Sequence, residues 1–92
     1  MDAPGPPPRF APLAWDEGQV GVLNCLDVPT RFTRARVPVP VVARVEWASP
    51  YGVEHIPTLA VGWTRERVLV ELSDRRCTFR GLWLAPVDVE RQ

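Results

Sequence analysis

The most informative stretch for the fold is Val37-Pro38-Val39-Pro40-Val41-Val42-Ala43-Arg44-Val45-Glu46-Trp47. In its second half, apolar residues at odd positions alternate with Val42, Arg44 and Glu46. This alternation predicts a half-buried β-strand, because successive side chains of a strand point to opposite faces of the sheet. Pro38 and Pro40 share one parity, so both missing backbone donors would lie on the same side of the strand. We therefore expect the start of this strand to be a free edge on that side.

The residues after this stretch continue a β pattern. Ser49-Pro50-Tyr51-Gly52 has the composition of a tight turn, and a returning strand is expected over 53–63. Pro57 predicts an irregular start to that strand, after which Leu59, Val61 and Trp63 alternate on one face. Two further strands are expected over 67–72 and 77–84, with turns over 64–66 and 73–76. The tryptophans at 47, 63 and 83 share the parity of apolar neighbours, which predicts core positions for them.

The residues before the decisive stretch divide into an arm and a first strand. Residues 1–14 carry five of the eleven prolines, which excludes a helix or an interior strand and predicts a Pro-rich extended arm. A short apolar run follows Gly18 and is expected to open the β pattern; it consists of Val20, Val22, Leu23 and Leu26. Residues 15–92 are therefore predicted to form one mainly β domain with about five strands, either a small barrel or a bent five-stranded meander.

A family resemblance comes from the last segment, Gly81-Leu82-Trp83-Leu84-Ala85-Pro86-Val87-Asp88-Val89-Glu90. It resembles the end of SH3-like small β-barrels, where a Gly-aromatic strand leads through a proline-containing single turn to a short closing strand. The resemblance implies that Gly81 and Trp83 lie in the fourth strand, Pro86 in a 3₁₀ turn and Val89 in the fifth strand. The opening motif and acidic loop of eukaryotic SH3 domains are absent, so the resemblance implies a fold and not their peptide-binding activity.

The charge balance argues against a general affinity for polyanions. Eleven basic residues, all arginine, face eleven acidic ones, whereas nucleic-acid-binding proteins usually carry excess positive charge. Two arginine-rich segments are nevertheless candidate phosphate-binding residues: Arg31, Arg34, Arg36 and Arg44, then Arg75, Arg76 and Arg80. The alternative is that these arginines lie on solvated strand faces and pair with the glutamates at 46, 54, 66 and 71.

The sequence contains no recognisable catalytic or metal-binding motif. His55 is the single histidine, and no serine or cysteine stands in a nucleophile motif. Cys25, His55 and Cys77 are too widely separated for the paired ligands of a zinc site, and there is no glycine-rich phosphate loop. We therefore expect no enzymatic activity, no cofactor and no metal, and we expect both cysteines to be buried, reduced thiols.

Localisation and partners follow from what the chain lacks and from its arm. No apolar segment is long enough to cross a membrane, and residues 1–8 do not resemble a secretory signal, so a cytoplasmic protein without a membrane partner is expected. The arm residues Pro7, Pro8, Arg9 and Phe10 are predicted to contact a partner, since extended Pro-rich segments dock on other surfaces. The alternative is a strap, including Leu13 and Trp15, that covers an open end of its own barrel.

The sequence thus predicts a non-enzymatic protein-interaction module whose partner is another protein or a second copy of the chain. Nucleic-acid binding through the arginine-rich segments is one alternative. A structural role within a larger assembly is the other.

Overall fold

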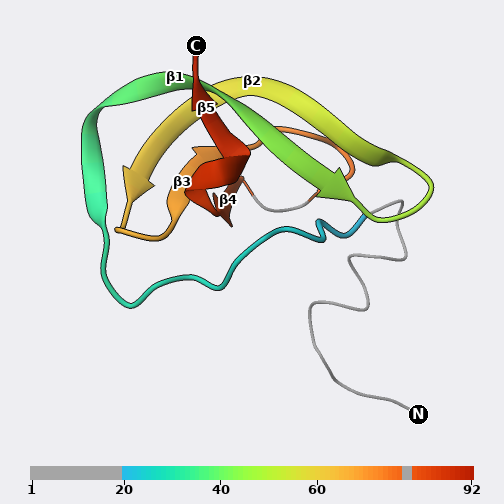
Figure 1. Cartoon of the computed structure of the whole chain (residues 1–92), viewed down its shortest axis with the longest axis horizontal. Helices are drawn as coiled ribbons and strands as arrows, with labels where there is room; N and C mark the ends of the chain where they lie inside the picture. The colour runs from blue at the N-terminus through green and yellow to red at the C-terminus, as the bar shows by residue number, and fades with distance from the viewer. Residues whose placement is uncertain (1–19, 78–79) are drawn as a thin grey trace.

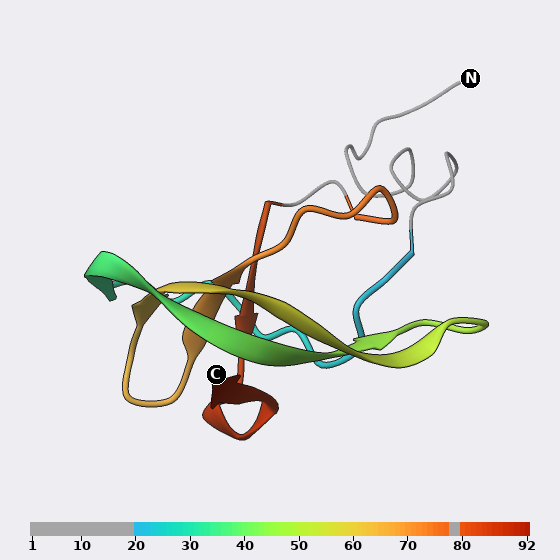
Figure 2. The same ribbon diagram turned by 90° about the horizontal axis from the view of Figure 1, so that it is seen from above.

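The computed structural model describes residues 20–77 and 80–92, which form a single antiparallel sheet (Figure 1). The strands are β1 (Thr33–Trp47), β2 (Gly52–Trp63), β3 (Val68–Glu71), β4 (Gly81–Leu84) and β5 (Val89–Arg91), with a 3₁₀ turn η1 (Pro86–Asp88) before the last. Their spatial order is β4-β3-β2-β1-β5. The prediction of a mainly β chain with a bent five-stranded meander is confirmed. β1 and β2 are long and strongly twisted, as the view from above shows (Figure 2).

The core lies on the face of β1 that the alternation predicts. Val41, Ala43, Val45 and Trp47 are each at most 3% exposed, whereas Arg44 and Glu46 on the other face are half-buried. The remaining core residues come from β2, β3 and β4 and from the residue after β3: Ala60, Val70, Leu72, Leu82 and Leu84. Burial of these aliphatic side chains and of the Trp47 ring is the main source of stability in so small a domain.

The three tryptophans expected in the core lie in three different environments. Trp47 is 1% exposed and belongs to the core. Trp83 is 5% exposed, and the Phe32 ring packs edge-on against it with 5.0 Å between ring centroids. Trp63 is 43% exposed, so the prediction of a core position is wrong for this residue.

A β-bulge explains the position of Trp63. β2 pairs with β3 at Ala60↔Val70 and Trp63↔Val68, so β2 uses one residue more than β3 between these pairs. Cross-strand partners share a face, and the extra residue therefore puts Trp63 on the same face as Ala60. The expected common face for Leu59, Val61 and Trp63 is wrong for this reason. Trp63 lies at the end of the core.

The prolines affect the sheet differently from one another. Pro57 was expected to disturb β2, but the register with β1 is unbroken from Gly52 to Ala60, so this expectation is wrong. The ladder between β2 and β3 starts only at Ala60, so the missing N–H of Pro57 leaves no strand partner unsatisfied there. The expected free edge for Pro38 and Pro40 holds at Pro38 only: β5 pairs with β1 from Val41 onward, and the Gln92 N–H donates to the Pro40 carbonyl.

The predicted first strand is not a strand. Residues 20–26 form no continuous ladder; they make an isolated bridge, Val22↔Trp47, and scattered backbone hydrogen bonds to several parts of the chain. The Leu23 N–H donates to the Glu46 carbonyl, and the Leu26 N–H donates to the Trp83 carbonyl. The segment therefore makes backbone hydrogen bonds to both β1 and β4, which are not neighbours in the sheet (Figure 1). Its apolar spacing is not strictly alternating, which fits a connecting segment better than a ladder strand.

The C-terminal residues occupy the places that the resemblance implies. Gly81 and Trp83 lie in β4, Pro86 begins η1 and Val89 begins β5. β4 starts at Gly81 and not at Cys77 as expected, with residues 78 and 79 outside the described part of the chain. β3 is likewise shorter than the predicted 67–72.

Two glycines are required by local geometry. Gly52, after the turn that contains the cis Ser49-Pro50 bond, has φ of 71°, a conformation that other residues adopt only at a cost. At Gly62, a Cβ atom would lie 2.9 Å from Cδ2 of Phe32 and 3.2 Å from the Thr33 carbonyl oxygen. Glycine at 62 therefore lets Phe32 close over the sheet and reach Trp83.

The predicted arm, including Pro7, Pro8, Arg9 and Phe10, and the boundary expected at residue 15 lie outside the described residues. Among the residues that are described, no helix is long and apolar enough to cross a membrane.

Candidate functional site

The structure does not bring the predicted basic residues together in one patch. Arg31, Arg34 and Arg36 lie at or just before the start of β1, which is on the left in both views. Arg75 and Arg76 lie in the loop after β3, on the other side along the horizontal axis (Figures 1 and 2). The remaining two, Arg44 and Arg80, lie in β1 and just before β4, respectively.

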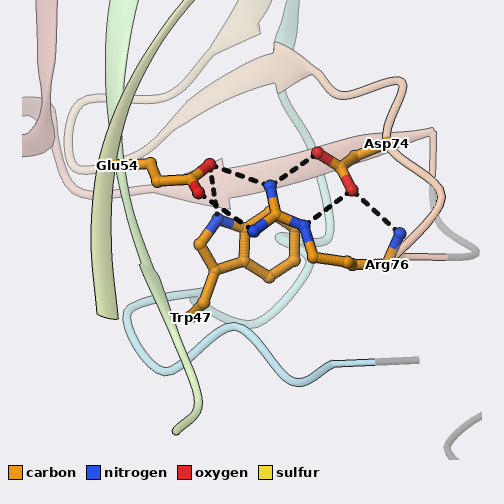
Figure 3. Close-up of polar contacts among 4 residues, drawn as sticks. All are labelled: Trp47, Glu54, Asp74 and Arg76. Carbon is orange, nitrogen blue, oxygen red and sulfur yellow. Dashed lines mark hydrogen bonds and ion pairs between the residues drawn. The ribbon is translucent and has the colours of Figure 1, made fainter. Parts of the chain in front are cut away.

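Arg76 is the centre of an ion-pair cluster (Figure 3). Its Nε and Nη2 atoms donate to the two carboxylate oxygens of Asp74 at 2.9 and 2.8 Å, and Nη1 and Nη2 donate to the carboxylate of Glu54 at 3.0 and 2.8 Å. Four of the five guanidinium N–H groups are thereby used. The guanidinium also lies over the Trp47 ring at 4.0 Å, and the Trp47 indole N–H donates to Glu54 at 3.3 Å.

This cluster ties three separate parts of the chain together. Arg76 and Asp74 come from the loop after β3, Glu54 from β2 and Trp47 from the end of β1. The side chains of Arg76 and Asp74 are only 19% and 20% exposed, so their charges are poorly screened by water. Arg76, one of the proposed phosphate-binding residues, therefore already has a structural role. We call the cluster of Trp47, Glu54, Asp74 and Arg76 the clamp.

The clamp shifts the protonation equilibria of its members. The hydrogen bonds from Arg76 lower the pKa of Asp74 from 3.8 to about 2, and they also lower the pKa of Glu54. The pKa of Arg76 is raised, first by Asp74 and then by Glu54. Each shift stabilises the charged form that the cluster needs.

We expect the clamp to make stability sensitive to acid. The folded protein binds the Asp74 proton more weakly than the unfolded chain, so the stabilisation is complete above about pH 4 and is lost as the pH falls to about 2. The loss should be on the order of 1–2 kcal/mol, allowing for partial solvent exposure. Urea unfolding followed by circular dichroism across this pH range would measure it.

The matched control for this experiment is a carboxylate outside the clamp. Asp74→Asn should flatten the acid-dependent loss of stability, whereas Asp27→Asn, at an exposed position, should leave it unchanged. An Asp74→Asn protein with the same acid dependence as the parent would contradict the assignment.

Arg44 is held in a second, more exposed cluster. Its guanidinium pairs with Glu46 at 2.6 Å and with Asp88 at 3.3 Å. The side-chain amide of Asn24 donates to Asp88 at 3.1 Å and to the Arg44 carbonyl at 2.8 Å. These contacts attach the segment over 20–26 and η1 to β1, so Arg44 also serves the fold.

The remaining arginines of the first segment are placed differently. Arg31, Arg34 and Arg36 are exposed and make no ion pair with any carboxylate in the described part of the chain. The Arg34 guanidinium lies over the Phe32 ring at 5.3 Å. Arg80, at the other basic segment, is exposed as well. The expected pairing of arginines with glutamates therefore holds for Arg44 and Arg76 and not for this group.

An apolar groove opens next to Trp63 at the end of the core. It has a volume of about 360 Å³ and is lined by Val39, Val41, Ala60, Trp63, Val68, Pro86, Val89 and Arg91. The walls come from β1, the end of β2, the start of β3 and the η1–β5 segment. Five of its eight lining residues are aliphatic, with one tryptophan and one proline, and among the described residues only Arg91 brings a charge to its wall.

Trp63 also lines a second hollow. It has a volume of about 390 Å³, and its lining residues are Arg31, Phe32, Thr33, Trp63, Thr64 and Arg65. We call the groove and this hollow together the Trp63 end. At this end an exposed aromatic ring, an apolar groove and arginines without ion-pair partners in the described part of the chain adjoin.

Sequence reasoning identified only part of the Trp63 end. Arg31 was proposed as a binding residue, but Trp63 was assigned to the core, and Arg65 and Arg91 were not singled out. The signal that could have indicated Trp63 was Gly62, because a glycine inside a strand often marks a bulge. The contribution of Arg91 depends on how β5 pairs with β1, which no local pattern reports.

The other candidate residues show no assembled site. His55 is exposed on β2, and no hydrogen bond joins it to a serine or cysteine among the described residues. Cys25 is exposed and Cys77 is half-buried, so the expectation of two buried thiols is wrong for Cys25, and the two cysteines do not form a disulfide with each other. Within the described ranges, no group of three potential metal ligands is present.

Comparison with known proteins gives no assignment. No family model, no curated protein and no solved structure matches this chain.

Proposed function

We propose that this chain is a non-enzymatic protein-interaction module that binds its partner at the Trp63 end. The observation that carries the proposal is the apolar groove beside an exposed tryptophan. Trp63 is 43% exposed, and the groove beside it is bounded almost entirely by apolar side chains. Exposed aromatic rings next to apolar pockets are typical of the central residues of protein interfaces.

The groove suits the capture of one apolar side chain from a partner. Its volume of about 360 Å³ lies near the lower limit of small binding pockets, which is roughly 300 Å³. Val39, Val68 and Val89 pack against the core and are partly buried, so the wall is held in place before any partner arrives. A preformed wall lowers the entropic cost of binding.

The proposal includes a likeness to SH3-like folds, here with an open sheet because β4 and β5 do not pair, and a cytoplasmic location. Five antiparallel strands with a 3₁₀ turn before the last one support this likeness. The location rests on the sequence alone, in which no apolar segment is long enough to cross a membrane.

Nucleic-acid binding is the second candidate function, and the exposed arginines at 31, 34 and 36 favour it. Guanidinium groups next to an exposed indole could contact phosphates and stack on a base. Two of the seven arginines proposed for this role, however, are committed to carboxylates. An anisotropy titration with labelled single-stranded and duplex oligonucleotides would test this candidate, and binding that weakens steeply with salt would support it.

The experiment for the proposed function is a selection of linear peptides from a random displayed library on the immobilised protein. Selected peptides would be titrated into ¹⁵N-labelled protein, and the amide shifts mapped by NMR. We expect the largest shifts at Val39, Val68 and Val89, together with the Trp63 indole N–H. We expect Trp63→Ala to weaken binding about 10-fold or more, because central aromatic residues dominate interface energies.

A matched variant is available at the other end of the sheet. Tyr51 is 51% exposed and lies after β1, away from the groove, so Tyr51→Ala should bind the peptides as the parent does. Thermal melts of both variants would show that the fold is retained. Failure to select any peptide, or shifts that map away from the groove, would refute the proposal.

A further inference from the structure

We infer that the segment bound at the Trp63 end is acidic, with an apolar side chain in the groove and carboxylates against Arg31, Arg65 and Arg91. This inference rests on the proposed function and specifies the chemistry of the partner. It follows from three features of this end of the molecule: the shared position of Trp63, the local excess of positive charge, and the aliphatic character of the groove.

Trp63 joins the apolar and the basic parts of the surface. Its side chain lines the groove together with Arg91, and it also lines the hollow together with Arg31 and Arg65. A partner side chain that enters the groove beside Trp63 therefore brings its neighbours in the chain close to guanidinium groups. The guanidinium fork matches a carboxylate with two parallel hydrogen bonds.

The net charge of the chain is zero, but the Trp63 end carries a local excess of positive charge. The two ion-pair clusters take up four carboxylates with only two arginines, Arg44 and Arg76. None of Arg31, Arg65 and Arg91 has an ion-pair partner among the residues that the structure describes. Positive charge is thus left over at the Trp63 end.

Two acidic residues lie nearby and reduce this field without cancelling it. Glu66 is exposed in the turn that follows Thr64, next to Arg65. Glu90 precedes Arg91 in β5, and alternation along the strand puts the two side chains on opposite faces. Arg34 and Arg36 add two exposed positive charges at the start of β1.

The aliphatic groove favours a peptide over a nucleic acid. Val39, Val68 and Val89 offer no hydrogen-bond donor or acceptor to a base or a phosphate. Trp63 is the only exposed aromatic side chain lining either hollow, whereas strands of nucleic acid usually stack on several rings. A second copy of the chain is also disfavoured, because a two-fold contact at this end would oppose like charges.

The test compares peptides that differ only in charge. Peptides from the selection would be sequenced, and Asp and Glu should be enriched over Lys and Arg beside the apolar anchor. For the best binder, a second peptide with Asn and Gln in place of Asp and Glu would be synthesised. We expect the acidic peptide to bind about 5- to 20-fold more tightly at about 50 mM salt, with the difference shrinking at about 300 mM.

Variants of the protein assign the effect to this surface. Arg31→Ala and Arg65→Ala should each reduce the preference for the acidic peptide, while Arg80→Ala, an exposed arginine before β4, should leave it intact. Equal affinity for the acidic and neutral peptides at the groove would overturn this inference and leave the proposed function standing. If no peptide binds and oligonucleotides do, both proposals fail and the nucleic-acid candidate is favoured.

Discussion

Replacing Trp47 with alanine is expected to lower the free energy of unfolding by about 3–5 kcal/mol, the usual cost of truncating a buried aromatic residue. The side chain is 1% exposed, and its ring is in the core cluster. The substitution also removes the surface on which the Arg76 guanidinium rests at 4.0 Å and the N–H that donates to Glu54. A loss of this size is a large fraction of the roughly 5–14 kcal/mol expected for a domain of this length.

Trp63→Ala is the natural comparison, since it removes the same side chain from the same sheet. Trp63 is 43% exposed, so the expected loss of stability is much smaller, about 1 kcal/mol. Urea unfolding of both variants, followed by circular dichroism, would measure the contrast. Equal losses for the two variants would mean that the assignment of Trp47 to the core and Trp63 to the surface is wrong.

Arg76→Met is the second substitution with a large expected effect, a loss of about 2–3 kcal/mol. It leaves the carboxylates of Glu54 and Asp74 beside each other without the cation that holds both. Arg76→Lys should recover only part of the loss, because one ammonium cannot reproduce four directed hydrogen bonds to two carboxylates. Equilibrium unfolding near neutral pH gives the comparison.

A combined variant separates the charge effect from lost packing. If unpaired carboxylates cause the instability, adding Glu54→Gln and Asp74→Asn to Arg76→Met should recover part of the lost stability. Arg36→Met, at an exposed position in β1, serves as the control and should change stability by no more than about 0.5 kcal/mol. An Arg76→Met protein as stable as this control would show that the clamp contributes nothing.

The two ion-pair clusters link the stability of the fold to the proposed function. Arg44 and Arg76 hold loops and turns in place by engaging acidic residues, and this use of carboxylates leaves other arginines without partners. A sequence with equal numbers of acidic and basic residues can therefore present a positive surface. Charge counting over the chain excludes a global field but not a local one.

The pattern of residues in the sequence predicts β1 to β4, apart from their exact bounds, and the face of β1 that forms the core. Alternation from Val41 to Trp47 reports burial directly, because the period of a strand is fixed by covalent geometry. Turn residues such as Gly52, and the C-terminal pattern around Trp83 and Pro86, likewise act locally, and the structure places them as expected.

Contacts between distant segments determine which arginines lack ion-pair partners among the described residues and whether Trp63 is buried or exposed. Arg76 meets Glu54 across 22 positions of sequence, and Arg44 meets Asp88 across 44, so no local pattern contains either pairing. The exposure of Trp63 depends on a bulge in β2 and on where the core ends, both of which are set by neighbouring strands. Such features arise from contacts between distant segments, and a sequence pattern of short range does not encode them.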